Sequence, residues 1–247
     1  SQERINEFMD EKTYSERKFR GNVIENEFES IKFADIQFTY EGSSRKALKN
    51  ISFEIPRGKV LGIIGKTGSG KTTIGNLLNA EQTSYSGNIY IGKYELRSIA
   101  LNDLRNKLSS VPQDAFLFSN TIKGNIAFGS KADEISGEII ESFAKKAAVH
   151  ENIIGFENKY ETMVGERGIT LSGGQKQRIT IARAMIREPE ILLFDDCLSA
   201  VDPETEKEIL GNMVDFMKYK TTLLISHRVS TVMHADEIIV LNEGEII

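Results

Sequence analysis

Eight consecutive residues have the types and the spacing needed to hold a phosphate group: Gly65–Thr72 reads GKTGSGKT and matches the pattern G-x-x-x-x-G-K-[ST]. Glycines permit backbone conformations in which successive N–H groups point at phosphate oxygens, and the N-terminus of a following helix adds partial positive charge. We expect Lys71 to reach the β- and γ-phosphates of a nucleotide and the Thr72 hydroxyl to bind Mg²⁺. The predicted nucleotide contacts of this region are Gly65, Lys66, Thr67, Gly68, Ser69, Gly70, Lys71, Thr72 and Thr73.

A second candidate residue stands at the end of an apolar run. Ile191–Phe194 predicts a buried strand that delivers Asp195 at its carboxyl end, where ligands bind in parallel sheets. Asp195 can hold Mg²⁺ through water, because this cation prefers oxygen ligands and keeps part of its hydration shell. An aspartate after a strand can instead cap the next helix. The nearby phosphate-binding pattern favours the metal role.

The segment Leu171–Gln175 reads LSGGQ. With it the sequence resembles the nucleotide-binding domain of ABC transporters, whose signature motif is LSGGQ. The resemblance implies that Ser172, Gly173, Gly174 and Gln175 close over the γ-phosphate held by a second cassette. Two cassettes would then form a head-to-tail dimer that encloses two ATP molecules. A helix cap with a Ser-Gly-Gly turn would explain the local residues but not the coincidence of motifs.

Further roles follow from the same resemblance, which runs from about Phe33 to Leu241. Tyr40 matches the aromatic residue that stacks on adenine, and Gln113 matches the residue that links Mg²⁺ and the attacking water to a helical insertion. Ser199–Asp202 resembles the loop that crosses the dimer interface. His227 matches the histidine that contacts the γ-phosphate. We therefore expect Lys71, Gln113, Asp196 and His227 to be catalytic and Thr72, Gln113 and Asp195 to bind the metal.

Three segments look like those of exporter cassettes, of a subfamily B-like half-transporter. Phe116–Ile126 resembles the part that touches the coupling helices of the transmembrane domain, Val164–Gly168 an exporter-specific loop before the signature, and Glu3–Asp10 the tail of a last transmembrane helix. The resemblance thus implies a cassette at the cytoplasmic face of the cell membrane, with the transmembrane part on its N-terminal side.

Position 196 departs from the family pattern, which usually has Glu after the metal-binding Asp to polarise the attacking water. Asp196 is shorter by one methylene, a retreat on the order of 1 Å that can cost roughly 10²-fold in rate. Such an aspartate is familiar in one partner of heterodimeric exporters. We therefore favour a heterodimer in which this chain binds ATP firmly and hydrolyses it slowly. An alternative function is a regulatory cassette that holds ATP and has a low turnover. In the alternative, Asp196 is an adequate base in an ordinary homodimer.

The elements that must position these residues alternate along the chain. Strand patterns at 31–40, 51–55, 60–64, 191–194, 221–225 and 237–241 are separated in the second half by helical patterns at 175–187 and 204–217. This alternation predicts an α/β fold with a mainly parallel sheet flanked by helices. The family resemblance specifies a P-loop NTPase core, an N-terminal antiparallel β subdomain and an inserted α-helical subdomain. We expect a linker at 1–30 and an ATPase domain at 31–247, with core residues 31–113 and 176–247 and a helical insertion at 114–175.

The composition excludes several function classes. The net charge of −5 argues against a nucleic-acid partner. The single cysteine, Cys197, excludes an intramolecular disulfide and a Cys-rich zinc site, and we expect it to be a small buried residue. No apolar run approaches the roughly 20 residues needed to span a bilayer. A chromosome-maintenance or ribosome-acting ABC ATPase predicts coiled coils or tandem cassettes, which the chain lacks. A transport ATPase and an ATP-holding regulatory module remain.

Overall fold

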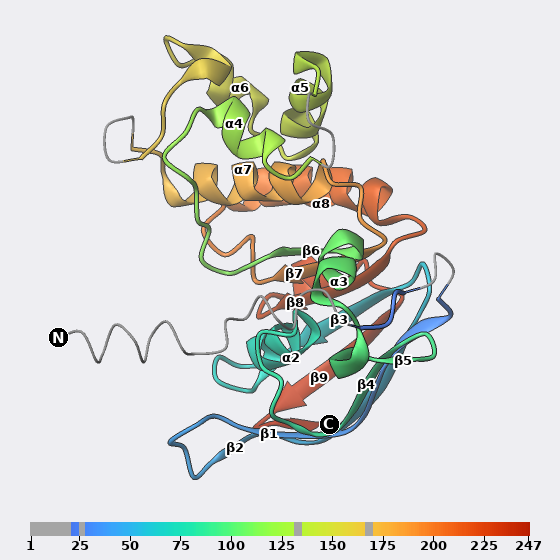
Figure 1. Ribbon diagram of the computed structural model, residues 1–247. Coiled ribbons are helices and arrows are strands. Elements are labelled where there is room, and N and C mark those ends of the chain that lie inside the picture. The colour runs from blue at the N-terminus through green and yellow to red at the C-terminus, as the bar shows by residue number, and fades with distance from the viewer. Residues whose placement is uncertain (1–20, 25–27, 131–134, 166–169) are drawn as a thin grey trace, which may run out of the picture.

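The computed structural model describes residues 21–24, 28–130, 135–165 and 170–247, and arranges them as two sheets beneath a group of helices (Figure 1). The strands are β1 Ser30–Thr39, β2 Lys46–Pro56, β3 Val60–Ile64, β4 Ser86–Ile91, β5 Tyr94–Glu95, β6 Leu108–Val111, β7 Ile191–Asp195, β8 Thr221–Ser226, β9 Glu237–Asn242 and β10 Glu245–Ile246. The helices are α2 Lys71–Leu78, α3 Leu101–Lys107, α4 Ile122–Ala127, α5 Gly137–Lys146, α6 His150–Ile154, α7 Gly173–Met185, α8 Pro203–Met217 and α9 Val229–Val232, with short 3₁₀ turns at Leu96–Ser98 and Lys159–Glu161.

The larger sheet has six strands in the order β10-β9-β3-β8-β7-β6, and its pairs are parallel except β10 with β9. Every residue of β7 is buried. Its successive side chains enter two different cores: Ile191 and Leu193 pack on one side of the sheet, and Leu192 and Phe194 pack on the other. A strand covered on both faces has no polar alternation, which explains the unbroken apolar run in the sequence.

The smaller sheet is antiparallel, with the order β2-β1-β4-β5. Phe33 of β1 pairs with Phe53 of β2, and their rings stack with centroids 4.5 Å apart. Leu48 of this sheet and Leu77 of α2 belong to one core, so the antiparallel sheet closes over α2 and one face of the parallel sheet. The expected α/β fold with an N-terminal antiparallel sheet is confirmed.

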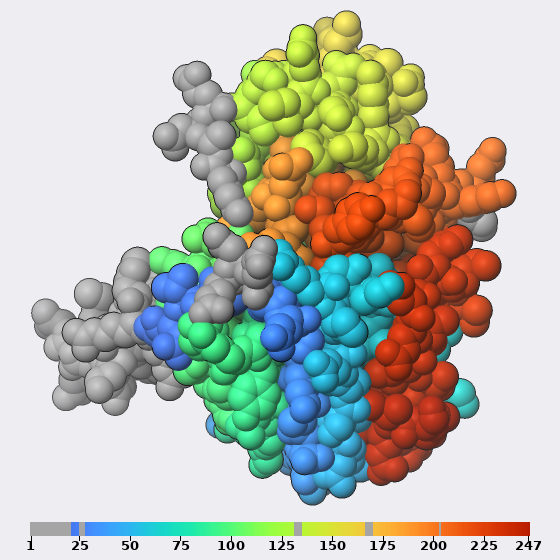
Figure 2. Space-filling view, turned by 90° about the vertical axis from the view of Figure 1, so that its right-hand side faces the viewer, coloured from blue at the N-terminus to red at the C-terminus, as the bar shows by residue number. Residues whose placement is uncertain are grey.

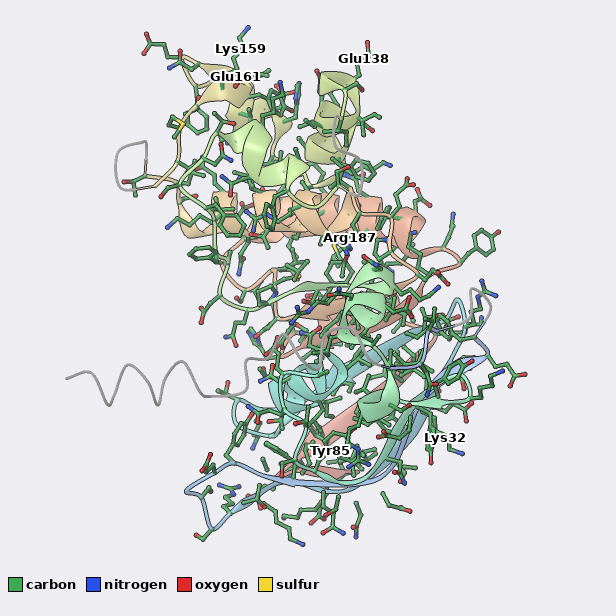
Figure 3. The ribbon with its side chains drawn as sticks, in the orientation of Figure 1. Lys32, Tyr85, Glu138, Lys159, Glu161 and Arg187 are labelled. Atoms are coloured by element: carbon green, nitrogen blue, oxygen red, sulfur yellow. The ribbon has the colours of Figure 1, made fainter. Side chains whose placement is uncertain are left out.

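Helices α4, α5 and α6 form a lobe above the sheets, visible in Figure 2 in yellow-green. Helix α7 lies between this lobe and the parallel sheet, since it contacts α4, α5 and β6. In Figure 3, Glu138, Lys159 and Glu161 project from the lobe, at the opposite end of the molecule from Lys32 and Tyr85. We propose that this lobe is the predicted helical insertion, ending where α7 enters the core.

The predicted linker covers residues 1–30, of which residues 1–20, with the segment Glu3–Asp10, lie outside the described part. Ile24 and Phe28 are buried in the same core as the antiparallel sheet, and Asn22 pairs with Ile99 in an isolated bridge. We therefore propose that the folded domain begins near Gly21. Among the described residues, no helix is both long enough and apolar enough to cross a membrane.

Candidate nucleotide-binding site

The glycine-rich segment joins β3 to α2. Gly68 and Gly70 have φ values of 79° and 105°, in the left-handed region that favours glycine. A Cβ atom at Gly65 would lie 2.2 Å from the carbonyl oxygen of Leu241, so that position also excludes a side chain. The sequence pattern thus reflects a backbone that only glycine can follow.

Lys71 begins α2, and its side chain turns back into the loop. Its Nζ donates to the carbonyl oxygens of Gly65, at 2.7 Å, and Lys66, at 2.9 Å. Burial lowers the pKa of the Lys71 ammonium, while the nearby carboxylates of Asp196 and Asp195 raise it. The position of Lys66, by contrast, contributes its backbone carbonyl to this arrangement.

A hollow of about 230 Å³ opens beside the loop. It is lined by Tyr40, Ala47, Thr67, Gly68, Gly70, Lys71, Thr72, Thr73, Gln113, Asp195 and Asp196. The structure therefore brings ten of the predicted site residues to one place, from the end of β1, the loop, α2 and the ends of β6 and β7. The hollow combines a lysine, hydroxyls, two carboxylates and an aromatic ring, which are the groups expected for a nucleotide phosphate with a cation.

Thr72 and Asp195 form the part of this hollow suited to Mg²⁺. The Thr72 Oγ1 donates to Asp195 Oδ1 at 3.2 Å. Burial raises the pKa of the Asp195 carboxyl, against the lowering effect of the Thr72 hydrogen bond. Within the described ranges no group of three or more His, Cys, Asp or Glu side chains could hold a metal alone. One carboxylate and one hydroxyl fit Mg²⁺ that takes its other ligands from phosphate and water.

Asp196 and His227 face each other at the rim of the hollow. The Nδ1 atom of His227 lies 2.8 Å from Asp196 Oδ1 and 2.7 Å from Asp196 Oδ2. Asp196 is held by its own N–H, which donates to the Ile225 carbonyl at 2.8 Å. The side chain of His227 is 43% exposed and that of Asp196 is 14% exposed, so the imidazole stands nearer to solvent. The following residue, Cys197, is buried and its pKa is raised by burial, as expected of an unreactive thiol.

Tyr40 lies at the opposite wall, just after β1. Its hydroxyl lies 3.0 Å from Thr73 Oγ1, and its ring meets Phe38 edge-on at 4.8 Å. The side chain is otherwise open, with 40% of Tyr40 exposed. A ring held at its edge and at its hydroxyl leaves a face free to stack on a planar base.

The signature residues stand apart from this hollow. Ser172 caps α7: its Oγ accepts from the Gln175 N–H at 3.2 Å, and Gln175 Oε1 accepts from the Ser172 N–H at 3.0 Å. This reciprocal pair is a capping box. None of the described residues 171–175 lines the hollow. The structure therefore does not bring the predicted signature contacts to this chain's own phosphate loop.

The sequence analysis missed Gln177, which ties several of these parts together. This residue of α7 is 4% exposed. Its Nε2 donates to the carbonyl of Gln113 at 3.2 Å, and its Oε1 accepts from the Ala200 N–H at 3.2 Å. A polar residue on the buried face of an amphipathic helix was the one signal in the sequence that marked it.

The family model of the ABC transporter matches residues 48–199, which include the loop, the signature and Asp195. The chain belongs to the ABC transporter family. It is 45% identical over 88% of its length to the iron-sulfur clusters transporter ABCB7, mitochondrial, of Danio rerio, and covers 29% of that protein. It is 42% identical over 95% of its length to the ATP-dependent lipid A-core flippase of Vibrio vulnificus, and covers 39% of it.

A solved structure agrees with these ABC relatives. The fold is similar to that of a bacterial Atm1-family ABC exporter with ATP bound, with a TM-score of 0.85 and 38% identity, over 92% of this chain and 39% of the other. The chain thus spans well under half the length of the relatives that it matches. The comparisons confirm the predicted family, its fold and its likeness to subfamily B-like exporter cassettes, and the ABC transporter domain implies ATP binding.

Proposed function

We propose that the chain is the ATP-hydrolysing cassette of an exporter, and that it binds Mg-ATP in the hollow between Tyr40 and Asp196. The observation that carries this proposal is the meeting of the phosphate loop, Thr72, Gln113, Asp195 and Asp196 in that one hollow. Tyr40 stacks on the adenine, residues 65–73 surround the phosphates, and Lys71 contacts the β- and γ-phosphates. Asp196 and His227 orient the attacking water and the γ-phosphate.

Thr72, Asp195 and Gln113 are the residues proposed to hold Mg²⁺. When bound, the ion neutralises charge on the β- and γ-phosphate oxygens. The Thr72–Asp195 hydrogen bond of 3.2 Å already sets two oxygen ligands side by side.

A second cassette is needed to complete the site. The residues Ser172, Gly173, Gly174 and Gln175 do not line this chain's own hollow. Ser172 and Gly173 are exposed at the start of α7, and a helix N-terminus favours an anion. We therefore propose a head-to-tail dimer in which each signature closes over the γ-phosphate of the other cassette. Because Asp196 replaces Glu, we favour a heterodimer whose partner carries the Glu; a homodimer with Asp196 as an adequate base is the second candidate.

The transmembrane part is proposed to dock in a hollow of about 560 Å³ between the helical lobe and the sheet. Phe116 and Phe128 line it and are each 65% exposed, and Arg187 reaches the same region (Figure 3). Arg183 of α7 donates to the Phe116 carbonyl at 2.8 Å and to Asn125 Oδ1 at 2.6 Å. A helix seated on these phenylalanines would thus move α7, whose N-terminus carries the signature. From the resemblance to exporter cassettes we propose that the chain lies at the cytoplasmic face of the membrane.

Titration of the chain with Mg-ATP tests the proposal. Lys71→Ala should abolish binding, because it removes the ammonium group that neutralises phosphate charge. Lys66→Ala is the matched control: it stands in the same loop, but the position supplies its carbonyl, so binding should persist. Binding retained by Lys71→Ala would overturn the assignment of the site. The rate of ATP hydrolysis is then measured for the chain alone and for its mixture with a second cassette that carries Glu at the position of Asp196.

A further inference from the structure

An ion pair between buried Glu206 and half-buried Arg228 lies next to His227. Glu206, in the first turn of α8, is 5% exposed, and one of its carboxylate oxygens accepts from Arg228 Nη1. Its other oxygen accepts from Thr231 Oγ1 at 2.9 Å and from Ser230 Oγ at 3.3 Å. Each oxygen of this buried carboxylate thus has at least one hydrogen-bond donor, as buried polar groups require.

Arg228 extends this pair to a second loop. Its Nη2 donates to the carbonyl of Ser199 at 3.1 Å. Ser199 belongs to the segment between Asp196 and α8, which is the segment that the family resemblance places at the dimer interface. One guanidinium thus joins α8, α9 and this interface loop in a fixed, planar geometry, which a lysine could not reproduce.

The same short loop carries His227 immediately before Arg228. The Asp196 carboxylate accepts from Ser226 Oγ at 3.4 Å and contacts His227 Nδ1, and the Arg228 N–H donates to Ser226 Oγ at 3.0 Å. The loop 226–228 is therefore held from two sides, by Asp196 on one side and by Glu206 on the other. Within the described part of the chain, the His227 imidazole makes hydrogen bonds only to Asp196.

We propose that Glu206 and Arg228 are positioning residues for ATP hydrolysis, which set His227 against Asp196 and link both to the interface loop at Ser199. The proposal rests on the proposed function, since it assigns His227 its task at the γ-phosphate. Neither residue lines the nucleotide hollow, so they act through His227 and the loop and touch no reacting atom. The geometry also gives a route by which a contact of the second cassette at Ser199 reaches the imidazole.

The test compares wild type, Glu206→Gln and Arg228→Lys. Glu206→Gln keeps the shape and the acceptor for Thr231 but removes the charge that holds Arg228. Arg228→Lys keeps a positive charge for Glu206 but loses the second nitrogen that bonds Ser199. Glu190→Gln is the matched control, because Glu190 pairs with Lys107 Nζ at 2.8 Å, and neither of those residues lines the hollow. A displacement of the imidazole near 1 Å should lower the turnover number roughly 10²-fold, with the ATP dissociation constant changed less than about threefold.

The imidazole itself supplies a readout that does not need turnover. The chain has three histidines, so the ¹⁵N resonances of His227 can be assigned by substituting His150 and His234. We expect Glu206→Gln and Arg228→Lys to shift the His227 Nδ1 resonance and Glu190→Gln to leave it unchanged. A folded Glu206→Gln with the wild-type resonance and wild-type turnover would overturn the proposal. If that variant does not fold, the Arg228→Lys spectrum decides by the same criterion. Wild-type protein that neither binds nor hydrolyses ATP would instead overturn the proposed function, while the resonance shift still tests the positioning.

Discussion

His227 Nδ1 lies within 2.8 Å of both carboxylate oxygens of Asp196. The two side chains therefore form one unit at the rim of the nucleotide hollow, in which the short carboxylate is drawn toward the imidazole. The Asp196 side chain is shorter than a glutamate side chain by one methylene, so its carboxylate lies farther from a bound nucleotide. The replacement of the family's usual Glu by Asp196 should therefore affect how closely the carboxylate approaches the attacking water.

Asp196→Glu should raise the rate of ATP hydrolysis at this chain's own phosphate loop, because the longer side chain advances the carboxylate by on the order of 1 Å. We expect an increase of up to about 10²-fold, with little change in ATP affinity. Single-turnover hydrolysis, with and without a partner cassette, measures it. If wild-type homodimers already hydrolyse ATP well and the variant is no faster, the slow-site interpretation is wrong and Asp196 is an adequate base.

Tyr40→Ala should weaken ATP binding about 10-fold to 100-fold, because stacking of a base on an aromatic ring is worth roughly 1–3 kcal/mol. Tyr40→Phe keeps the ring and loses only the 3.0 Å contact with Thr73, so its affinity should stay near wild type. Calorimetric titration with ATP and with inorganic triphosphate separates the two parts of the ligand. An equal loss for triphosphate, which has no base, would contradict the stacking role.

The loop after β3 and the buried strand β7 could be predicted because their sequence signals are local. Gly65–Lys71 must adopt one backbone path, and the apolar run of β7 must cross a core on both faces. Helix α3 and strand β6 were not predicted: α3 has only seven residues, and β6 reads LSSV at the sheet edge. Helical and strand periodicities need more residues than these elements provide.

Local sequence signals could not identify Glu206 and Arg228 as partners. Glu206 and Arg228 are 22 residues apart, and only the packing of α8 against α9 makes them partners. The domain start that we propose near Gly21 could not be predicted for a related reason. Val23-Ile24 and Phe28 are too few apolar residues to show a strand or helix period, and the burial of Ile24 and Phe28 depends on a sheet formed by later parts of the chain.

Asp236 provides a pH-dependent contribution to stability away from the site. Its carboxylate accepts from the Val60 N–H at 2.8 Å and from Lys59 Nζ at 2.9 Å, and the Lys59 hydrogen bond, followed by that of Val60, lowers its pKa. A depressed pKa adds stability that is present above the unfolded-state value, near 4, and is lost as the pH falls through the folded-state value. Asp236→Asn should therefore lower the free energy of unfolding at pH 7 by under about 1 kcal/mol, because the group is exposed.

Urea denaturation of both proteins between pH 7 and pH 3 measures this difference. It should be constant down to about pH 5 and shrink below about pH 4, where the wild-type carboxyl also becomes neutral. Lys59→Met is the matched control, since it removes the ion pair and keeps the bond to Val60. A difference that grows as the pH falls would contradict the assignment.

The exposed phenylalanines beside Arg183 should matter only when the transmembrane part is present. Phe116→Ser with Phe128→Ser removes the apolar surface proposed to receive a coupling helix, while both rings lie outside the nucleotide hollow. In the full-length transporter we expect transport and transport-stimulated ATP hydrolysis to fall at least about tenfold, because burial of each ring contributes roughly 1.5–3 kcal/mol. ATP binding by the isolated chain should be unchanged. Tyr219→Asn is the control, because Tyr219 is 91% exposed and lines a different hollow. Equal loss of transport in the control would show that the phenylalanine surface is not the docking site.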